Sequence, residues 1–278
     1  SAAACAECYF DAACRMGTAA NERKTAEYRG EQCPRLCVGK SRERGQQINE
    51  RGMRMIRGVV FDLDGTLLDT EKLYRRFWVE AARQMGYPME DRHALMIRSM
   101  AAEKAERLLR REVCAEFDYH AVRGLRREQM EAYIDENGVE PKPQMLETLT
   151  ELRRMNLRIG LATATPESRA RKYLRMVGAE EKFDAIACAE MVAHGKPSPD
   201  VYLLAAEKLG LKPENVLGVE DAPSGVRAAY DAGMRTVMIP DQDEPDEETA
   251  ALCTLITPTL SGIIPFIRKE NELNKHKL

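Results

Sequence analysis

The fold is decided by residues 56–70, which read IRGVVFDLDGTLLDT. The first six are mostly apolar or β-branched, as in a short buried strand. Asp62 and Asp64 follow at a spacing of two, and extended backbone turns residues at that spacing to the same side. Gly65 then lets the chain turn without a Cβ penalty. Because ligands of doubly wound sheets bind at the carboxyl ends of strands, we expect both carboxylates to address one ligand.

Two other interpretations of this acidic stretch are a solvated turn and a calcium-binding loop. A calcium loop needs Gly at its sixth position and Glu at its twelfth. Leu67 and Leu73 occupy those positions, which excludes the calcium loop. The solvated turn stays open on this stretch alone, so the decision depends on the rest of the chain.

Strand and helix patterns alternate along most of the chain from residue 55 onward. Residues 71–137 are charged, poor in strand formers and apolar at helical spacing. Beyond them we expect strands at 157–163, 183–187, 215–220 and 236–239, and helices at 145–155, 166–177, 198–209 and 223–232. Ser198 is the expected N-cap of its helix. Repeated βα units predict an α/β fold, a doubly wound parallel sheet with helices on both faces.

These patterns also predict the domain boundaries. A Rossmann-like core takes residues 55–69 plus 141–267, and an all-helical cap at 70–140 is inserted into it. Residues 268–278 read as a frayed helical tail. Hinges of the cap are expected at 69–72 and 137–141.

The first 52 residues differ from the rest in composition. They hold five of the eight cysteines and show no helical or strand periodicity. Two cysteine pairs, 5/8 and 33/37, could supply four thiolates to zinc, although the long spacing and a leftover cysteine disfavour this. Because a convincing start appears at Met55, we expect residues 1–52 to be a disordered extension or the product of a mis-set translation start.

Composition narrows the class of protein. The 278 residues carry a net charge of −3 with a pI of about 6.0, so the chain lacks the basic footprint of a nucleic-acid-binding protein. No run approaches the ~18 consecutive apolar residues of a membrane span. The cysteines beyond residue 52 lie among apolar or mixed neighbours, as reduced thiols do. We expect a cytoplasmic protein, a monomer in the simplest case, with neither nucleic acid nor membrane as partner.

Chemistry-bearing residues follow three further predicted strands. Thr163 ends one apolar strand and can donate a hydrogen bond to a phosphate oxygen. Lys196 lies between Gly and Pro just before a helix, and its point charge suits phosphate. Glu220 and Asp221 end a buried strand, where acids are costly unless they bind a cation or hydrogen-bond. Mg²⁺ is the natural partner of such carboxylate oxygens.

In their order along the chain, these segments resemble the haloacid dehalogenase superfamily. The resemblance covers residues 55–267 and rests on Asp62-x-Asp64-Gly65-Thr66, Thr163, Lys196 and Glu220-Asp221. Within that superfamily, the chain is similar to the β-phosphoglucomutase-like and phosphoglycolate-phosphatase-like branch. The resemblance implies that Asp62 is a nucleophile that forms an aspartyl-phosphate. It implies that Asp64 is the general acid toward the leaving oxygen and then the base for water.

The resemblance also implies the binding residues. Thr163 and Lys196 would hold the transferring phosphoryl group. Mg²⁺ would be bound by Asp62, the backbone carbonyl of Asp64, and Asp221, with Glu220 coordinating it or orienting a water. This fits the physics of phosphoryl transfer, because an anionic nucleophile approaches an anionic phosphate only where cations neutralise the charge.

The expected activity is that of a Mg²⁺-dependent phosphomonoesterase acting on a small phosphorylated metabolite such as a sugar phosphate. A β-phosphoglucomutase-type phosphomutase is the alternative, and a non-catalytic binding protein of this fold is a second one. Such mutases carry a histidine twelve residues after the nucleophile, where this chain has Tyr74. We expect Tyr74 to contact substrate from the cap, with Arg75, Arg76 and Arg98 as further candidates. Phe77 and Trp78 are expected to pack inside the cap.

Overall fold

The computed structural model describes residues 55–98, 100, 102–241 and 244–275. The expectations for residues 1–52, including the cysteine pairs and the translation start, therefore lie outside the described residues. Among the residues that are described, no helix combines the length and the apolar character that crossing a membrane would need.

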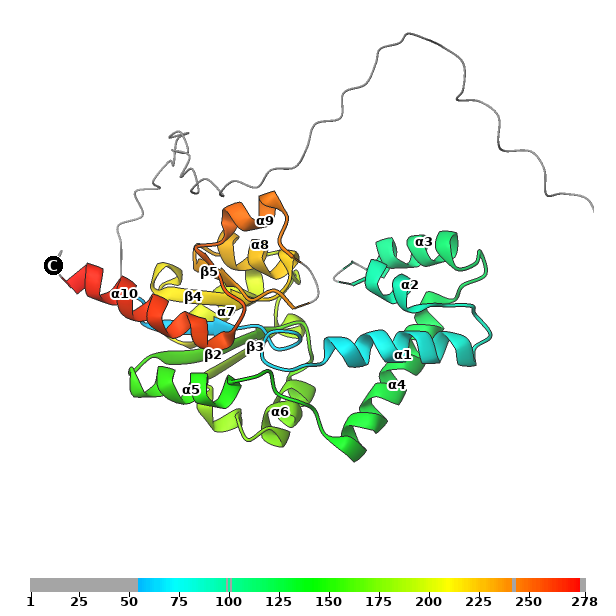
Figure 1. Cartoon of the computed structure of the whole chain (residues 1–278), viewed down its shortest axis with the longest axis horizontal. Coiled ribbons are helices and arrows are strands. Elements are labelled where there is room, and N and C mark those ends of the chain that lie inside the picture. Colours follow the sequence, from blue (N-terminus) through cyan, green and yellow to red (C-terminus); the bar gives the residue numbers. More distant parts are fainter. Residues whose placement is uncertain (1–54, 99, 101, 242–243, 276–278) are drawn as a thin grey trace, which may run out of the picture. The chain divides into compact units, whose positions relative to one another are not determined.

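The centre of the fold is a six-stranded sheet in the order β3-β2-β1-β4-β5-β6 (Figure 1), in which every pair of neighbours is parallel. Its strands are β1 (Gly58–Phe61), β2 (Arg158–Thr163), β3 (Ala185–Cys188), β4 (Val216–Glu220), β5 (Arg235–Met238) and β6 (Leu255–Ile256). Phe61 is in register with Leu161 of β2 and with Val219 of β4. The residues that follow β1, β2 and β4 therefore emerge at the same edge of the sheet.

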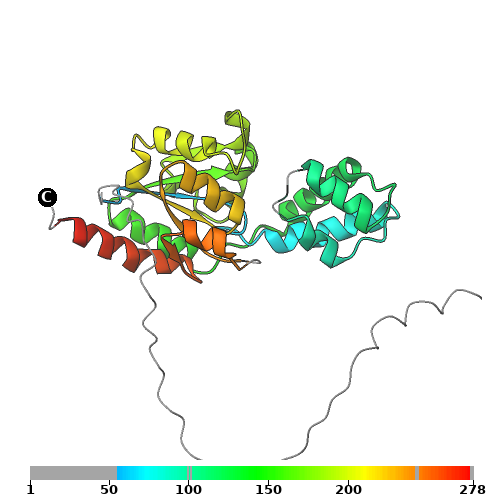
Figure 2. The same ribbon diagram turned by 90° about the horizontal axis from the view of Figure 1, so that it is seen from above.

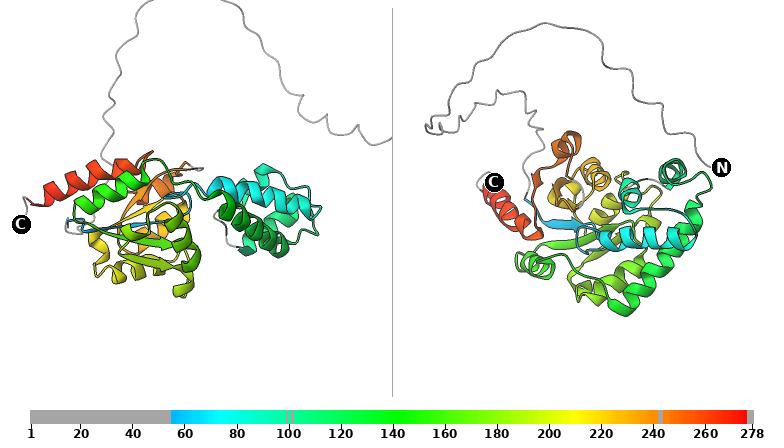
Figure 3. Two further views of the ribbon diagram at one scale, coloured as in Figure 1. Left: turned by 90° about the horizontal axis from the view of Figure 1, so that it is seen from below. Right: turned by 45° about the vertical axis from the view of Figure 1, so that its right-hand side comes forward.

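Helices cover both faces of the sheet because successive residues of β1 point in opposite directions. Val59 and Phe61 belong to the apolar cluster of α5 (Met145–Arg154), α6 (Glu167–Met176) and α10 (Ile263–Lys275). Val60 belongs to the cluster of α7 (Asp200–Lys208) and α8 (Pro223–Asp231) on the other face. Figure 3 shows α5 and α10 side by side on their face. A further helix, α9 (Glu247–Leu252), follows β5. Short 3-10 helices lie at Glu180–Lys182, Ala189–Met191, Pro213–Asn215 and Leu260–Gly262. The predicted doubly wound parallel sheet is confirmed.

Between β1 and α5 the chain forms four consecutive helices, which we call the helical insertion. They are α1 (Glu71–Gln84), α2 (Asp91–Met96), α3 (Ala102–Glu112) and α4 (Tyr119–Asn137). Figure 2 shows these helices gathered around one another. Trp78 lies in an apolar cluster of the insertion's own, as expected. Phe77 instead belongs to the cluster that continues into the sheet, and its ring lies 5.5 Å from that of Tyr133.

Two local expectations differ from the structure, and one strand was not expected. Helix α7 begins at Asp200 after Pro199, and Ser198 does not cap it because its hydroxyl donates to Asp200 Oδ1 (2.6 Å). Helix α10 continues through the expected tail to Lys275. It is held there by Asn271, whose side chain accepts from the backbone N–H of Ile56 (2.7 Å) and donates to its carbonyl (3.0 Å). Strand β6 was not predicted, because a strand of two residues is too short to show an alternating apolar pattern.

Candidate active site at the carboxyl edge of the sheet

Lys196 joins the ends of three neighbouring strands. Its Nζ donates to Asp62 Oδ1 after β1 (2.5 Å), to Glu220 Oε1 at the end of β4 (2.5 Å) and to the carbonyl of Ala162 in β2 (2.9 Å). Burial alone would lower the pKa of Lys196, but the carboxylates of Asp62 and Glu220 outweigh it and raise that pKa. Lys196 is therefore a fixed, buried cation beside the first acid of the motif.

Asp62, Glu220 and Asp221 form a buried acidic cluster. Each offers an oxygen within 4.8 Å of the others. Burial, and then the neighbouring carboxylates, raise the pKa of Asp62 well above its usual value despite Lys196. The same two causes raise the pKa of Asp221 to about 8. Negative charge thus exceeds positive charge at this cluster.

Two glycines make room for the cluster. Gly65 has a φ of +86°, and a Cβ on it would lie 2.3 Å from Asp221 Oδ2. A Cβ on Gly225, in the first turns of α8, would lie 2.0 Å from Glu220 Oε1. The carboxylates of Asp221 and Glu220 therefore pack directly against the backbone of Gly65 and Gly225. The three carboxylates of Asp62, Glu220 and Asp221 are hard oxygen donors, and their negative charge exceeds the positive charge of Lys196. Such a cluster fits a divalent cation such as Mg²⁺.

Asp64 lies beside this cluster and has its own partners. Its two carboxylate oxygens accept from the hydroxyls of Thr70 (2.7 Å) and Thr165 (2.7 Å). These bonds fix the carboxylate from both sides, one partner coming from the start of the insertion and one from the loop after β2. The expected metal ligand at Asp64 is its backbone carbonyl, and that assignment stays a prediction.

Thr163 is fully buried at the end of β2, and its hydroxyl accepts from the backbone N–H of Thr165 (3.0 Å). It therefore shapes the turn that brings Thr165 to Asp64. Our sequence reasoning missed both Thr165 and Thr70. The available signal for Thr165 was its position two residues after the end of a predicted strand. No local sequence pattern marks Thr70 as a partner of Asp64.

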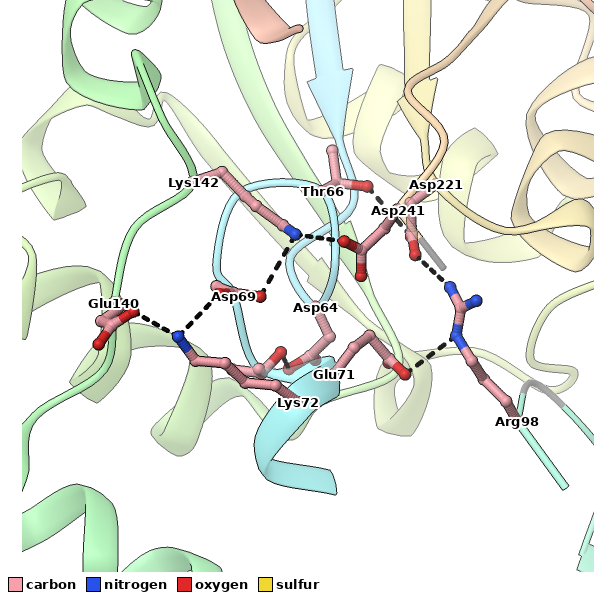
Figure 4. Close-up of polar contacts among 11 residues, drawn as sticks. Asp64, Thr66, Asp69, Glu71, Lys72, Arg98, Glu140, Lys142, Asp221 and Asp241 are labelled. Carbon is pink, nitrogen blue, oxygen red and sulfur yellow. Dashed lines mark hydrogen bonds and ion pairs between the residues drawn. The ribbon is translucent and has the colours of Figure 1, made fainter. Parts of the chain in front are cut away.

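Arg98 of the helical insertion reaches the acidic cluster (Figure 4). Its Nη2 donates to Asp221 Oδ2 (3.0 Å) and its Nε to Glu71 Oε2 (3.0 Å), while Thr66 Oγ1 donates to Asp221 Oδ1 (3.2 Å). Burial raises the pKa of Glu71 to about 7, although Arg98 opposes the shift. Arg98 is the sequence-predicted arginine that lies deepest, because its side chain is only 7% exposed.

The two connections between core and insertion run side by side. Leu68 pairs with Pro141, and the backbone N–H of Asp69 donates to the carbonyl of Glu140 (2.9 Å). Lys72 ion-pairs with Asp69 (2.8 Å) and with Glu140, as Figure 4 shows. These are the segments where hinges are expected.

Tyr74 borders two cavities at this edge, of about 300 and 530 Å³. The larger one also touches Asp64 and Thr165, so it opens directly onto the catalytic candidates. Arg126 lies against the Tyr74 ring at 4.8 Å from its centroid. Our sequence reasoning missed Arg126, because its helix carries arginines at three positions and only the fold distinguishes the buried one. Arg75 is half exposed and paired with Asp91 (3.0 Å), and Arg76 is paired with Glu80 (2.8 Å).

Comparisons with known proteins agree on one family. The haloacid dehalogenase-like hydrolase model matches residues 56–233. A phosphorylated carbohydrates phosphatase of Thermotoga maritima is 31% identical over 64% of this chain and 82% of its own length. The fructose-1-phosphate phosphatase YqaB of Escherichia coli is 32% identical over 65% of this chain and 94% of its own length. The crystal structure of a CbbY variant from Rhodobacter sphaeroides in complex with xylulose-(1,5)bisphosphate is similar at a TM-score of 0.62 and 29% identity, over 74% of this chain and 96% of that one.

Proposed function

The chain belongs to the haloacid dehalogenase-like hydrolases, as the sequence resemblance predicted, and on that premise we propose that it is a Mg²⁺-dependent phosphomonoesterase that acts on a small phosphorylated sugar or a similar ester. Relatives named as phosphatases of phosphorylated carbohydrates and of fructose 1-phosphate support the substrate class. The observation that carries the proposal is the contact of Lys196 Nζ with Asp62 Oδ1 at 2.5 Å, inside the acidic cluster.

The proposed reaction has two halves. A carboxylate oxygen of Asp62 attacks phosphorus, and the ester P–O bond breaks. The electron pair leaves with the alcohol oxygen, which takes a proton from Asp64. Asp64 then accepts a proton from water. The water oxygen attacks phosphorus, breaks the bond to Asp62 and frees inorganic phosphate. The hydroxyls of Thr70 and Thr165 keep the Asp64 carboxylate in one orientation for both proton transfers.

The negative charge of the phosphoryl group would be neutralised by Lys196 and by Mg²⁺. Lys196 and the loop of Thr163 and Thr165 would hold the phosphoryl oxygens. Asp62, Asp221, Glu220 and the Asp64 carbonyl would hold Mg²⁺. When bound, the ion neutralises phosphate charge so that an anionic nucleophile can approach an anionic ester. The helical insertion would act as a cap that excludes water, with Tyr74 facing the substrate.

The test is phosphate release from a panel of sugar, polyol and small organic phosphates. We expect release with Mg²⁺ present, its loss in EDTA, and its return when Mg²⁺ is added in excess of the chelator. Full activity in EDTA would contradict the metal scheme, and no release from any ester would contradict the function.

The mutase alternative is tested with β-glucose 1-phosphate. We expect free phosphate, because Tyr74 stands where such mutases carry a histidine. Accumulation of glucose 6-phosphate would replace the phosphatase proposal with the mutase one.

A further inference from the structure

Arg98 lies between a carboxylate of the helical insertion and a carboxylate of the acidic cluster (Figure 4). Its Nε donates to Glu71 Oε2 (3.0 Å) and its Nη2 donates to Asp221 Oδ2 (3.0 Å). The side chains of Arg98, Glu71 and Asp221 are 7%, 19% and 4% exposed, respectively. Because both hydrogen bonds are charge-assisted and shielded from water, they hold the guanidinium in one place.

This arginine also restrains the carboxylate of Asp221. Oδ2 of Asp221 accepts from Arg98 while Oδ1 accepts from Thr66 Oγ1 (3.2 Å), so both oxygens are held. An ionised carboxylate has about four lone-pair sites, and the two hydrogen bonds leave the others for a cation. Hydrogen bonds of this kind orient a metal ligand, and their loss typically lowers metal affinity by about 10–100-fold.

Glu71 decides the sign of the effect on a divalent cation. An isolated guanidinium beside the acidic cluster would repel such an ion. The Glu71 carboxylate offsets that repulsion, because it pairs with the Nε of the same guanidinium. The negative charge of Asp62, Glu220 and Asp221 therefore stays available to the ion. Arg98 thus orients Asp221 at little electrostatic cost.

We propose that Arg98 is a positioning residue of the metal site, through which the helical insertion orients Asp221 and strengthens the binding of Mg²⁺. The proposal rests on the proposed function in one respect, namely that the acidic cluster binds Mg²⁺. It replaces the expectation that Arg98 contacts substrate, because two carboxylates of the protein already engage its guanidinium. Since coupling is reciprocal, Mg²⁺ binding should also stabilise the arrangement of the insertion that brings Arg98 to Asp221.

The test is a calorimetric titration of the metal-free protein with MgCl₂ at constant ionic strength. A pH of 8 keeps Glu71 ionised, because its pKa is about 7. Arg98→Met removes both donors and keeps an unbranched side chain, and we expect the Kd for Mg²⁺ to rise at least tenfold. An unchanged Kd would overturn the proposal. A lower Kd would overturn it as well, because it would mean that Arg98 repels the ion.

Two further variants and a control separate orientation from charge and from folding. Arg98→Lys keeps the charge but not the planar fork, so it should restore part of the lost affinity. Arg92→Met removes the same charge from the exposed side of α2 and should change the Kd less than twofold. Glu71→Gln leaves Arg98 without its counter-charge, so the Kd should rise at least threefold. If circular dichroism shows that Arg98→Met does not fold, an unchanged Kd in Glu71→Gln would overturn the proposal.

Trp78 reports on the coupling to the insertion. It is the single tryptophan of the chain, and it lines the cavity of about 300 Å³ together with Arg98. We expect saturating Mg²⁺ to shift the emission of Trp78 in the wild-type protein and to leave it unchanged in Arg98→Met. The same response in both proteins, or no response in either, would overturn the reciprocal coupling.

Steady-state kinetics distinguish this role from contact with substrate. At saturating Mg²⁺ we expect kcat and the KM for the best ester of the panel to stay within threefold of wild type in Arg98→Met, because Arg98 acts through Asp221. A raised KM with an unchanged Kd for Mg²⁺ would return Arg98 to the substrate and overturn the proposal.

The two proposals fail in different ways. Weaker Mg²⁺ binding by Arg98→Met, without phosphate release from any ester by the wild-type protein, would keep the positioning role and remove the phosphatase. Mg²⁺-dependent phosphate release with equal Kd values in the wild-type protein and Arg98→Met would do the reverse.

Discussion

The buried charges at the sheet edge are paired with opposite charges, whereas the buried arginine of the helical insertion is not. At the sheet edge, Lys196 touches two carboxylates at 2.5 Å, and Asp221 accepts from both Thr66 and Arg98. In the insertion, Arg126 lies among aromatic rings and other arginines. The first region contains both signs of charge, and within the described residues the second has no acid to match Arg126.

The contrast separates two tasks. Groups that move protons and phosphoryl units need fixed partners, because their geometry must hold through the reaction. A group that recognises a ligand gains most when the ligand itself supplies the missing charge. We therefore expect substitutions at the sheet edge to change the rate of the chemical step. Substitutions in the insertion should instead change stability and the choice of substrate.

The largest effect is expected for Asp62→Asn. Asn cannot form the acyl phosphate, so kcat should fall by at least about 10³-fold. The fold should persist, because Asn has nearly the same shape and Lys196 keeps its bonds to Glu220 and Ala162. Circular dichroism and phosphate release on one preparation measure both. Asp231→Asn on the exposed end of α8 is the control, and should leave the rate unchanged. Retained turnover in Asp62→Asn would remove Asp62 as the nucleophile.

Gly225→Ala should have the next largest effect. Its new Cβ would lie 2.0 Å from the Glu220 carboxylate, so that carboxylate must move, and with it the Lys196 ammonium that it holds. Misplacement of such groups by about 1 Å costs on the order of 10² in rate. We expect a loss of that size together with weaker Mg²⁺ binding, measured by kinetics and metal titration. A rate within threefold of wild type would show that Glu220 has room to relax.

The sheet edge could be predicted from sequence because parallel strands bring their carboxyl ends together. Once β1 and β4 are neighbours, the residues after them must meet, and the acidic cluster follows. Lys196 comes from the segment after β3, which pairs with β2 at the same edge. Thr70, Thr165 and Arg126 could not be predicted in the same way. Their positions depend on a loop conformation and on which side of α4 packs inward, and neither leaves a local pattern. The prediction that Ser198 caps its helix was wrong for a similar reason, because its hydroxyl donates to Asp200 Oδ1 and does not bond to the helix backbone.

Glu71→Gln probes the boundary between the two regions through pH. Burial raises the pKa of Glu71 from 4.5 to about 7 in the folded protein, so the folded state binds the proton more tightly than the unfolded state. The stability that this proton confers is complete below about pH 4.5 and is lost as the pH rises through about 7. Gln keeps the neutral form at every pH. Urea unfolding in EDTA should therefore find the variant close to wild type in stability at pH 4.5, and more stable by about 3 kcal/mol at pH 8.

Glu80→Gln is the matched control for that experiment, because it lies on the half-exposed side of the same helix. It should not reproduce the pH-dependent difference. A constant offset between Glu71→Gln and wild type at all pH values would mean that Glu71 does not titrate in this range, and that Arg98 holds it ionised.

Gly124→Ala should have the smallest effect, and it should be stabilising. Gly124 lies in the interior of α4 between Arg123 and Arg126, and a Cβ there would meet nothing within 4 Å. Ala is favoured over Gly inside a helix by about 0.5–1 kcal/mol, since the unfolded chain loses less freedom. A rise of about 1–4 °C in Tm is expected for a chain of this size. The same chemical change at Gly225 is expected to impair the active site, because a Cβ there meets the Glu220 carboxylate. A fall in Tm would mean that α4 needs backbone freedom beside the arginines, and that the insertion is as tightly constrained as the sheet edge.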